Sequence, residues 1–527
     1  MASTTTTSDT YSKRDKARVW QWADVKDAVE EHGRIMFLYK ESVYDVTAWA
    51  KTHPGGELAL RHLNGKDATD VMRVFHPPSV VKQRLPHFLA GVLHPSAVAT
   101  MSSPPLIVDP SLYPDAETYD ASPIKPILDH PELAPKGNYI STMDHPEGVP
   151  LESQAFIKHT EQVLIKYRAL DETLRARGLY TTRMSLYWLN LVKFFVLLGT
   201  ALYLVVGVIS PALSGAAAPL SPLALWTATL TAAVLMGMFW HQNAFVAHDA
   251  GHISVTANYT ADWYLGWILG NVTGGISIGW WKKSHNVHHI ITNHPEHDPD
   301  IQHLPVFAVT PLFFQNMWSS FHKKTMVFDV FARAFVSVQH YAYYPIMMVA
   351  RFNLYAQSVI YLLTDRDTNK HPRIELAGLV IFWTWFGYLL SYLRPHFGVL
   401  FTFLMVSHAV TFLLHLQITL SHFAMSVHEV SPNEAFPSRQ LRTTMDVDCP
   451  TWLDWFHGGL QFQAVHHLFP RLPRTSFRAA RPLVEQFARE TGLVYTLVPF
   501  IEGNGMVLAN FREVARQMKI VFHNKAE

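Results

Sequence analysis

Three groups of side chains in this sequence have the spacing of metal ligands on helices. In the stretch 280–289, His285, His288 and His289 follow an i, i+3, i+4 pattern. On a helix these three imidazoles project from one face. One such group could be a solvated histidine patch, but three groups in one chain indicate a metal site. The other two groups are His248 with His252, and Gln463 with His466 and His467.

Two further histidines, near the N-terminus, have the setting of haem ligands. His53 begins the run His-Pro-Gly-Gly, and His76 precedes Pro77 about two dozen residues later. Two histidines that each end a short helix can bind a haem iron from both sides, which leaves no position for oxygen and restricts the haem to electron transfer. Together with the segment 44–49, this pattern resembles the haem-binding core of cytochrome b5. The alternative is a pair of surface histidines beside a Pro-Gly turn.

The number and type of ligands predict two non-haem irons. The histidine groups supply more imidazoles than one metal ion can use, and neutral imidazole suits iron and zinc. Cys449 is the single cysteine, so neither a thiolate zinc cluster nor an iron–sulfur cluster can form. Iron is favoured over zinc because zinc cannot accept the electron that a haem donor would supply.

Two other side chains are candidate ligands with open roles. Gln463 stands where a third histidine would complete His-x-x-His-His, and its amide oxygen could ligate a metal or only bond to a ligand. His422 follows His408 and His415 at seven-residue intervals. At 1.5 Å rise per residue, neighbours in this series lie roughly 10 Å apart, so one metal centre cannot use all three. We expect His422 to be a ligand and the other two to be buried polar residues, at the lining of a channel.

Polar residues just after the first of these groups are predicted to orient it. Asn293, Asp298 and Asp300 follow His289 closely. Side chains of these types accept N–H bonds from metal-binding imidazoles and fix their tautomers.

The composition indicates a membrane protein. Charged residues make up 16% of the 527 residues and hydrophobic residues 49%, against about 25% charged residues in average soluble domains. The net charge of +1 argues against a nucleic-acid partner.

Four apolar segments are long enough to span a bilayer, which takes about 20 residues of helix. The segments 263–281 and 306–314 are shorter or broken, and we interpret them as interfacial or re-entrant. Basic residues flank the first pair of spans, which places both chain termini and all three histidine groups on the cytosolic side. The four predicted spans are 186–209, 223–245, 374–393 and 397–420.

The predicted fold is therefore multi-domain. A small α+β haem domain (17–93) precedes a Pro-rich linker (94–150) and an all-α membrane domain (151–527) with four transmembrane helices and a cytosolic histidine-rich cap. Residues 152–177 have helical periodicity and are predicted to form an interfacial or docking helix. The first nine residues have no apolar core behind them and do not form a signal peptide.

With these motifs the chain resembles cytochrome b5-fused front-end membrane desaturases over nearly its whole length. The resemblance implies haem b, a di-iron centre that activates O2, a membrane-lipid substrate, reduction by NADH-cytochrome b5 reductase, and the endoplasmic reticulum membrane. It assigns the haem to His53 and His76. The irons are assigned to His248, His252, His285, His288, His289, His466 and His467, and also to His422 and Gln463.

Within that family, the stretches 421–425, 442–450 and 461–467 look most like fungal delta-8 sphingolipid desaturases. The expected substrate is then the long-chain base of a ceramide. A delta-5 or delta-6 acyl-lipid desaturase is the alternative, and a lipid hydroxylase on the same scaffold is a further one. A non-enzymatic haem or metal-binding membrane protein would leave the three histidine groups unexplained.

Overall fold

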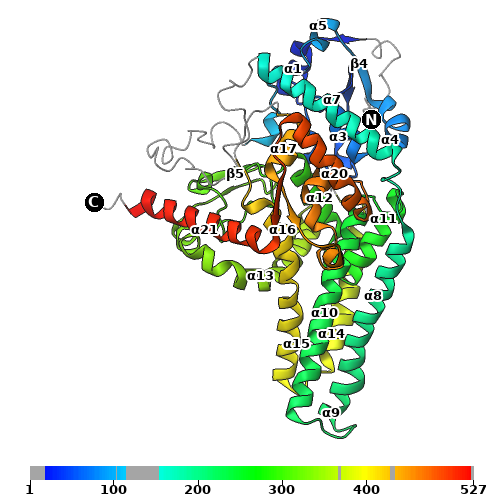
Figure 1. The fold of residues 1–527 in the computed structure, drawn as a ribbon, viewed down its shortest axis with the longest axis vertical. Helices are drawn as coiled ribbons and strands as arrows, with labels where there is room; N and C mark the ends of the chain where they lie inside the picture. Colours follow the sequence, from blue (N-terminus) through cyan, green and yellow to red (C-terminus); the bar gives the residue numbers. More distant parts are fainter. Residues whose placement is uncertain (1–17, 102–103, 114–153, 366–368, 428–433, 524–527) are drawn as a thin grey trace, which may run out of the picture.

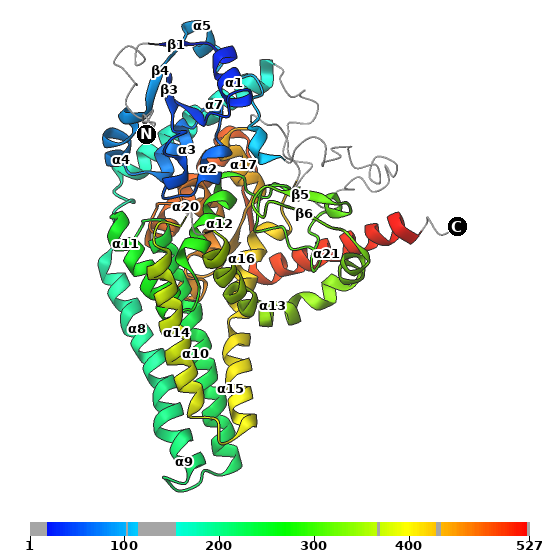
Figure 2. The same cartoon turned by 180° about the vertical axis from the view of Figure 1, so that it is seen from behind.

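The structure is a computed structural model that describes residues 18–101, 104–113, 154–365, 369–427 and 434–523. Its long axis is set by a bundle of apolar helices, with an irregular helical cap at one end of the bundle. A small α/β module lies on the cap, at the end farthest from the bundle (Figure 1). The C-terminal helix projects sideways from the cap, as the view from behind also shows (Figure 2).

The N-terminal module, residues 19–93, is built on a four-stranded sheet of order β1-β4-β3-β2. Strands β2 and β3 form an antiparallel hairpin, and β1 pairs with β4 in parallel. Apolar side chains of the sheet belong to two hydrophobic clusters, one with the first helix and one with the short helices. We call residues 19–93 the haem module. Its elements are β1 (Val19–Trp20), α1 (Trp22–Glu30), β2 (Met36–Tyr39), β3 (Ser42–Asp45), α2 (Glu57–Arg61), α3 (Thr69–Phe75), α4 (Pro78–Gln83) and β4 (Leu89–Leu93).

The first part of the predicted linker packs against this module. After α5 (Pro95–Val98), Asp109 accepts hydrogen bonds from Asn64 and Arg61. Trp318 of the following domain donates to the carbonyl of Leu112. Residues 114–153, which hold the rest of the predicted linker, lie outside the described part of the chain.

Four long helical segments run along the bundle, and each predicted span lies almost wholly on one of them. Helix α10 packs closely against α8 and α15, and α8 continues through a π-helical turn at Leu204–Ile209 into α9. A single residue, Thr411, interrupts the last segment, and its hydroxyl donates to the His408 carbonyl at the helix break. The helices are α8 (Met184–Tyr203), α9 (Ser210–Ser214), α10 (Pro222–Gly251), α14 (Pro372–Ser391), α15 (Phe397–Val410) and α16 (Phe412–Phe423).

A fifth helix, α13 (Val330–Thr364), is also long and apolar enough to cross a membrane. It runs beside α21 across the end of the bundle that meets the cap, and not along the bundle (Figures 1 and 2). Tyr343 of α13 and Phe511 of α21 are buried in the apolar cluster between them. Within the described residues five helices are therefore candidate spans, and the four-span count stays a prediction.

The cap consists of α11, α12, the hairpin of β5 and β6, and the elements from α17 onward. The predicted interfacial segment 263–281 forms α11 and a π-helical turn at Trp267–Val272, which packs against α14. Segment 306–314 holds a single 3-10 turn at Pro311–Phe313. The cap elements are α11 (Tyr259–Gly266), α12 (Ile278–Ile290), β5 (Met317–Ser319), β6 (Lys324–Met326), α17 (Phe436–Thr443), β7 (Met445–Asp448), α18 (Asp454–His457), α19 (Gln463–Leu468), α20 (Arg474–Thr491), β8 (Thr496–Pro499) and α21 (Phe500–His523).

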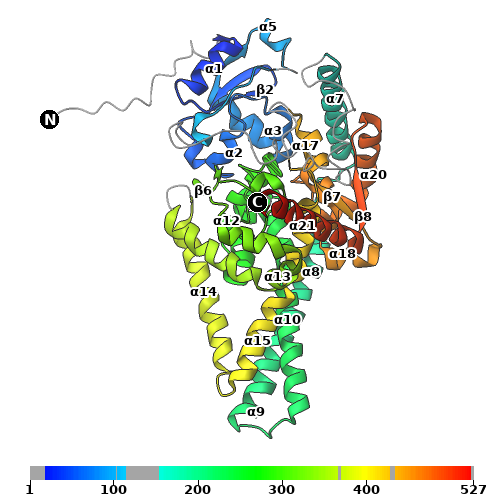
Figure 3. The same cartoon turned by 90° about the vertical axis from the view of Figure 1, so that its left-hand side faces the viewer.

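Helix α7 (Gln154–Ala176) joins the haem module to the cap, as expected for a docking helix. It lies beside α20 (Figure 3) and also contacts α3 and α17. Arg168 forms a bidentate pair with Asp70 of the module, at 2.8 Å for both bonds. Arg73 of the module donates to Asp171 of α7 at 3.0 Å. Because bidentate pairs fix orientation as well as distance, these contacts hold the module in one pose on the cap.

The closest helix packing in the bundle depends on Gly237 of α10. A Cβ there would lie 2.5 Å from the Ser407 carbonyl oxygen and 2.6 Å from Val410 Cβ. We therefore expect Gly237→Val to destabilise the folded protein by about 1–3 kcal/mol through overpacking. A Cβ added at Gly199 would meet no atom within 4 Å, so Gly199→Val is the matched control. Thermal unfolding in detergent measures both, and equal melting temperatures for the two variants would contradict the packing.

Candidate metal centre

His53 and His76 face each other across a cavity in the haem module. Their ring centroids lie 6.1 Å apart, which fits one iron between them with metal–nitrogen bonds of about 2 Å on each side. The cavity, of about 380 Å³ including the space open to solvent, is lined mainly by apolar side chains such as Trp49, Leu60 and Phe88. Burial lowers the pKa of His53 to about 4 and is also the main cause that lowers the pKa of His76 to about 3. Both imidazoles are therefore neutral at pH 7, as iron ligands must be.

Histidines from three distant segments converge under the module. His248 and His252 come from the end of α10, His285 from α12 and His466 from α19. One ligand atom from each lies within 4.8 Å of those of the other three. The Nε2 atoms of His248 and His285 are 3.1 Å apart, the spacing of two ligands that share a metal ion at about 2.1 Å. We call these four residues the first histidine group.

A second histidine group consists of His288, His422 and His467, whose ligand atoms also lie within 4.8 Å of one another. They come from α12, the end of α16 and α19. The expectation that only His422 of its seven-residue series reaches the other ligands is thus consistent with the geometry. His408 and His415 are buried farther along the helices, where their Nδ1 atoms contact the carbonyls of Leu404 and Met347.

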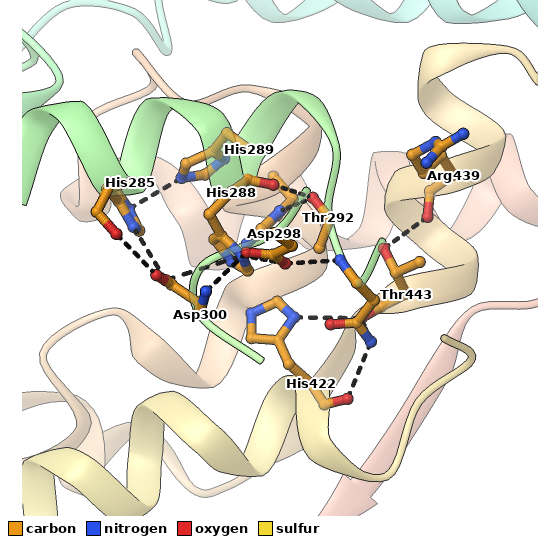
Figure 4. Close-up of polar contacts among 12 residues, drawn as sticks. His285, His288, His289, Thr292, Asp298, Asp300, His422, Arg439 and Thr443 are labelled. Carbon is orange, nitrogen blue, oxygen red and sulfur yellow. Dashed lines mark hydrogen bonds and ion pairs between the residues drawn. The ribbon is translucent and has the colours of Figure 1, made fainter. Parts of the chain in front are cut away.

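His289 lies between the two groups. Its Nε2 atom is 3.0 Å from Nε2 of His285 in the first group, and its ring stacks on His467 of the second at 4.2 Å. Figure 4 shows His285, His288 and His289 on one side of α12, facing His422. The i, i+3, i+4 spacing therefore places one histidine of α12 in each group and a third between them.

Every member of the second group has its Nδ1 atom next to a fixed acceptor. His288 Nδ1 donates to Asp298 at 2.8 Å, and His422 Nδ1 to the Thr443 carbonyl at 3.2 Å (Figure 4). His467 Nδ1 donates to the side-chain oxygen of Gln440 at 2.9 Å. With the proton held on Nδ1, each Nε2 lone pair is free to bind a metal.

The predicted role of Asp298 is thereby confirmed, while that of Asn293 is wrong. The Asn293 amide donates to the backbone carbonyls of His422 and Ser426, and so fixes the end of α16, not an imidazole. Asp300 lies 3.8–3.9 Å from His285 and His288. Its charge helps to raise the pKa of His288.

Sequence reasoning missed Gln440 and Thr443. Gln440 also donates to the carbonyl of His289 at 3.0 Å and accepts a bond from Thr292 at 3.0 Å, so it ties α17 to α12 and α19. No motif marks these positions, because their partners lie about 20 to 150 residues away in the chain.

The electrostatics of the two groups favour neutral ligands around a cation. Burial and then the charges of neighbouring histidines hold the pKa values of His252, His289, His466 and His467 well below the usual range. At His288 burial lowers the pKa, but the charges of Asp298 and Asp300 outweigh it and raise the pKa to about 9. The two carboxylates thus favour positive charge at His288, whether a proton or a metal ion supplies it.

Unpaired nitrogen atoms inside the site fit a metal better than a hydrogen-bonded core. Buried nitrogens without a hydrogen-bond partner among the described residues include Nε2 of His252, Nε2 of His467 and both ring nitrogens of His466. Buried polar atoms are rarely left unpaired in a stable core. Gln463 is buried at the start of α19, the helix that also carries His466 and His467.

The haem module touches the metal-site helix directly. Phe75, which precedes His76, packs edge-on against His289 with ring centroids 6.2 Å apart. Asn286 of α12 donates to the carbonyl of Gly55, two residues after His53, at 3.2 Å. The segments next to both predicted haem ligands therefore contact α12.

Comparison with known proteins gives two family matches. The Fatty acid desaturase family matches residues 224–499, and the Cytochrome b5-like Heme/Steroid binding domain matches residues 21–94. The chain is 38% identical to a Delta 8-(E)-sphingolipid desaturase of Emericella nidulans, with 93% of each chain covered. It is 37% identical to the enzyme of that name from Kluyveromyces lactis, over 95% of this chain and 93% of the relative. Identity to an Acyl-lipid (9-3)-desaturase of Borago officinalis is 32%, over 94% and 93%.

The second histidine group gives a graded test of the metal site. His288→Ala removes a predicted ligand, so we expect loss of bound metal without unfolding of the apolar helices, whose insertion depends on their length. Asp298→Asn removes only the partner of that ligand and should weaken metal binding by about 10- to 100-fold. Metal content of the purified variants is measured, with the exposed His32→Ala as control. A full metal complement in His288→Ala would rule out the assignment.

Proposed function

The chain belongs to the fatty acid desaturase family and carries a cytochrome b5-like domain, and we propose that it desaturates the long-chain base of sphingolipids at the delta-8 position. As a member of this family it is an oxidoreductase. The observation that carries the proposal is the pair of histidine groups with unpaired nitrogens directly beneath a haem-type histidine pair. A hydrolytic or structural zinc site would have no use for that electron donor.

The residues around the histidine groups would hold two non-haem irons. Two irons bound there would activate O2 and supply the oxidising power that removes two hydrogens from unactivated methylene groups. The first group with His289 and the second group would provide the ligands, with Gln463 as a further candidate. Asp298, Gln440 and the Thr443 carbonyl hold the Nδ1 protons, which keeps the three Nε2 atoms pointed at one position.

Electrons would enter through the haem module. A haem b held by His53 and His76 would pass single electrons to the metal centre. Phe75 and Asn286 hold this cavity close to α12, and the ion pairs of α7 with Asp70 and Arg73 fix the pose. In this proposal a cytosolic NADH-cytochrome b5 reductase reduces the haem.

The arrangement of the apolar helices supports a multi-pass protein of the endoplasmic reticulum membrane. Along the bundle run α8, α10, α14 and α15, whereas α13 lies across its end (Figures 1 and 2). We infer four spans, with the cap, the haem module and both termini in the cytosol. This topology places the reductase, the haem and the irons in the same compartment.

The substrate proposal depends on the relatives. The proteins named Delta 8-(E)-sphingolipid desaturase are 35–38% identical to this chain, against 32% for the acyl-lipid enzyme of Borago officinalis. Since both kinds cover nearly the whole chain, the difference in identity favours a sphingolipid, and the names of the fungal relatives favour a trans double bond. An acyl-lipid substrate is the alternative outcome of the test below.

The haem ligands give a prediction about electron entry. His53→Ala or His76→Ala should abolish turnover driven by NADH and the reductase, because the haem iron loses an axial ligand. Non-haem iron content should stay at the wild-type level, since neither residue belongs to the histidine groups. The measurement is turnover and iron content side by side. Full turnover by either variant, with no free cytochrome b5 added, would refute the role of the module.

Expression in a host whose sphingoid bases lack the delta-8 bond tests the substrate. The lipids are hydrolysed, and long-chain bases and fatty acids are analysed separately by mass spectrometry. We expect a new double bond at position 8 of the long-chain bases, absent when His288→Ala is expressed. A new double bond confined to fatty acids would replace the sphingolipid proposal by the acyl-lipid alternative.

A further inference from the structure

Arg471 is a buried cation for which the described part of the chain offers no hydrogen-bond partner. It lies between α19 and α20, with 8% of its surface exposed. Its Nε and Nη1 atoms are buried and unpaired. Burial lowers the pKa of the guanidinium to about 10, so it remains charged at neutral pH. A buried charge without a partner is strongly destabilising, so this position favours an anionic ligand.

The residue lies where the cap meets the haem module. Phe469 and Leu472, on either side of Arg471, pack in one apolar cluster with Val74 and Phe75 at the end of α3. The next residue of the module is His76. Burial lowers the pKa of His76 most, followed by the charge of His53 and then by the charge of Arg471. Arg471 therefore lies near one of the two predicted haem ligands.

The nearby carboxylate is already engaged. Asp171 lies close enough for its charge to act on Arg471, but it accepts hydrogen bonds from Arg73, Arg175 and Tyr180. Arg175 is held in turn by the carbonyl of Arg73. Asp171 thus serves the contact between α7 and α3, and its bonds do not reach Arg471.

The cavity between the two haem ligands has no buried cation among its described lining residues. Among its described lining residues, Arg84 is the one permanently charged side chain, and it is exposed. A haem b that binds between His53 and His76 brings two propionate carboxylates to the edge of this cavity. A guanidinium is a strong donor to carboxylates, and the Nε and Nη1 groups of Arg471 are both without a partner among the described residues.

We propose that Arg471 of the cap binds a haem propionate, so that the haem itself forms part of the contact between the haem module and the cap. This inference rests on the haem-binding role proposed for His53 and His76. It makes docking depend on haem: loading of the module neutralises a cation that is otherwise buried unpaired, and the loaded module is the one held over the metal centre.

The test measures haem loss from the purified full-length protein to excess apomyoglobin, after loading with haem b or with its dimethyl ester. The ester has no propionate charge but keeps the iron and its axial ligands. We expect Arg471→Gln to lose haem b at least tenfold faster than wild type, the worth of one charged hydrogen bond. Loss of the ester should be the same from both proteins. Arg471→Lys should lose haem b at a rate between those of wild type and Arg471→Gln, because lysine keeps the charge but not the planar set of N–H donors.

Arg177→Gln is the matched control, because Arg177 is an exposed arginine just after α7. It should lose haem b at the wild-type rate. Equal rates for haem b and its ester from wild type would overturn the inference, and this comparison stands even if Arg471→Gln does not fold. Faster loss of both haem b and ester from Arg471→Gln would also overturn it, since the effect would then be structural. A wild-type protein without a haem spectrum would overturn the haem-binding function itself.

Discussion

The structure depends on keeping buried imidazoles in the correct tautomer and pointed at common positions. A buried histidine meets this requirement only if one ring N–H donates a hydrogen bond to a fixed acceptor while the other ring nitrogen remains free. In the second histidine group the acceptors are a carboxylate, an amide oxygen and a backbone carbonyl. They come from α17 and the turn after α12, so these elements and α12 must all fold before all three imidazoles are correctly held.

The helix bundle also helps to bring the buried histidines to common positions. Helices α10 and α16 leave the apolar bundle at the same end and carry His248, His252 and His422 in their last turns or just beyond. Both helices belong to segments that are long and apolar enough to cross a membrane, and spans of similar apolar length end at similar depth. Close packing at Gly237 keeps α10 and α15 together. The histidines on these helices can therefore meet the histidines of the cap without long loops.

The haem module adds a second charge-controlled contact. Its ion pairs with α7 include Asp70, whose side chain is 8% exposed, and Asp171, whose side chain is 1% exposed. Buried pairs of this kind contribute orientation more than net stability, because desolvation offsets much of their attraction. What they orient is Phe75 against His289, the contact that brings the haem cavity to the metal-site helix. The proposed bond of Arg471 to a haem propionate would add a charged contact between the cap and the cofactor.

The sequence by itself determined the features that depend on local periodicity. The spacing of His285, His288 and His289 placed three imidazoles on one helix face, apolar length marked the helices of the bundle, and the motifs at His53 and His76 indicated the haem module. Tertiary structure alone decided the rest: that His289 lies between the two groups, that Gln440 and Thr443 hold ligand protons, that Asn293 binds a helix end, and that α13 runs across the bundle. These contacts join residues far apart in the chain, and helical or strand periodicity in the sequence cannot predict them. Hydropathy could not have decided the orientation of α13 either, because the same apolar length suits a helix that crosses a membrane and a helix that lies along its surface.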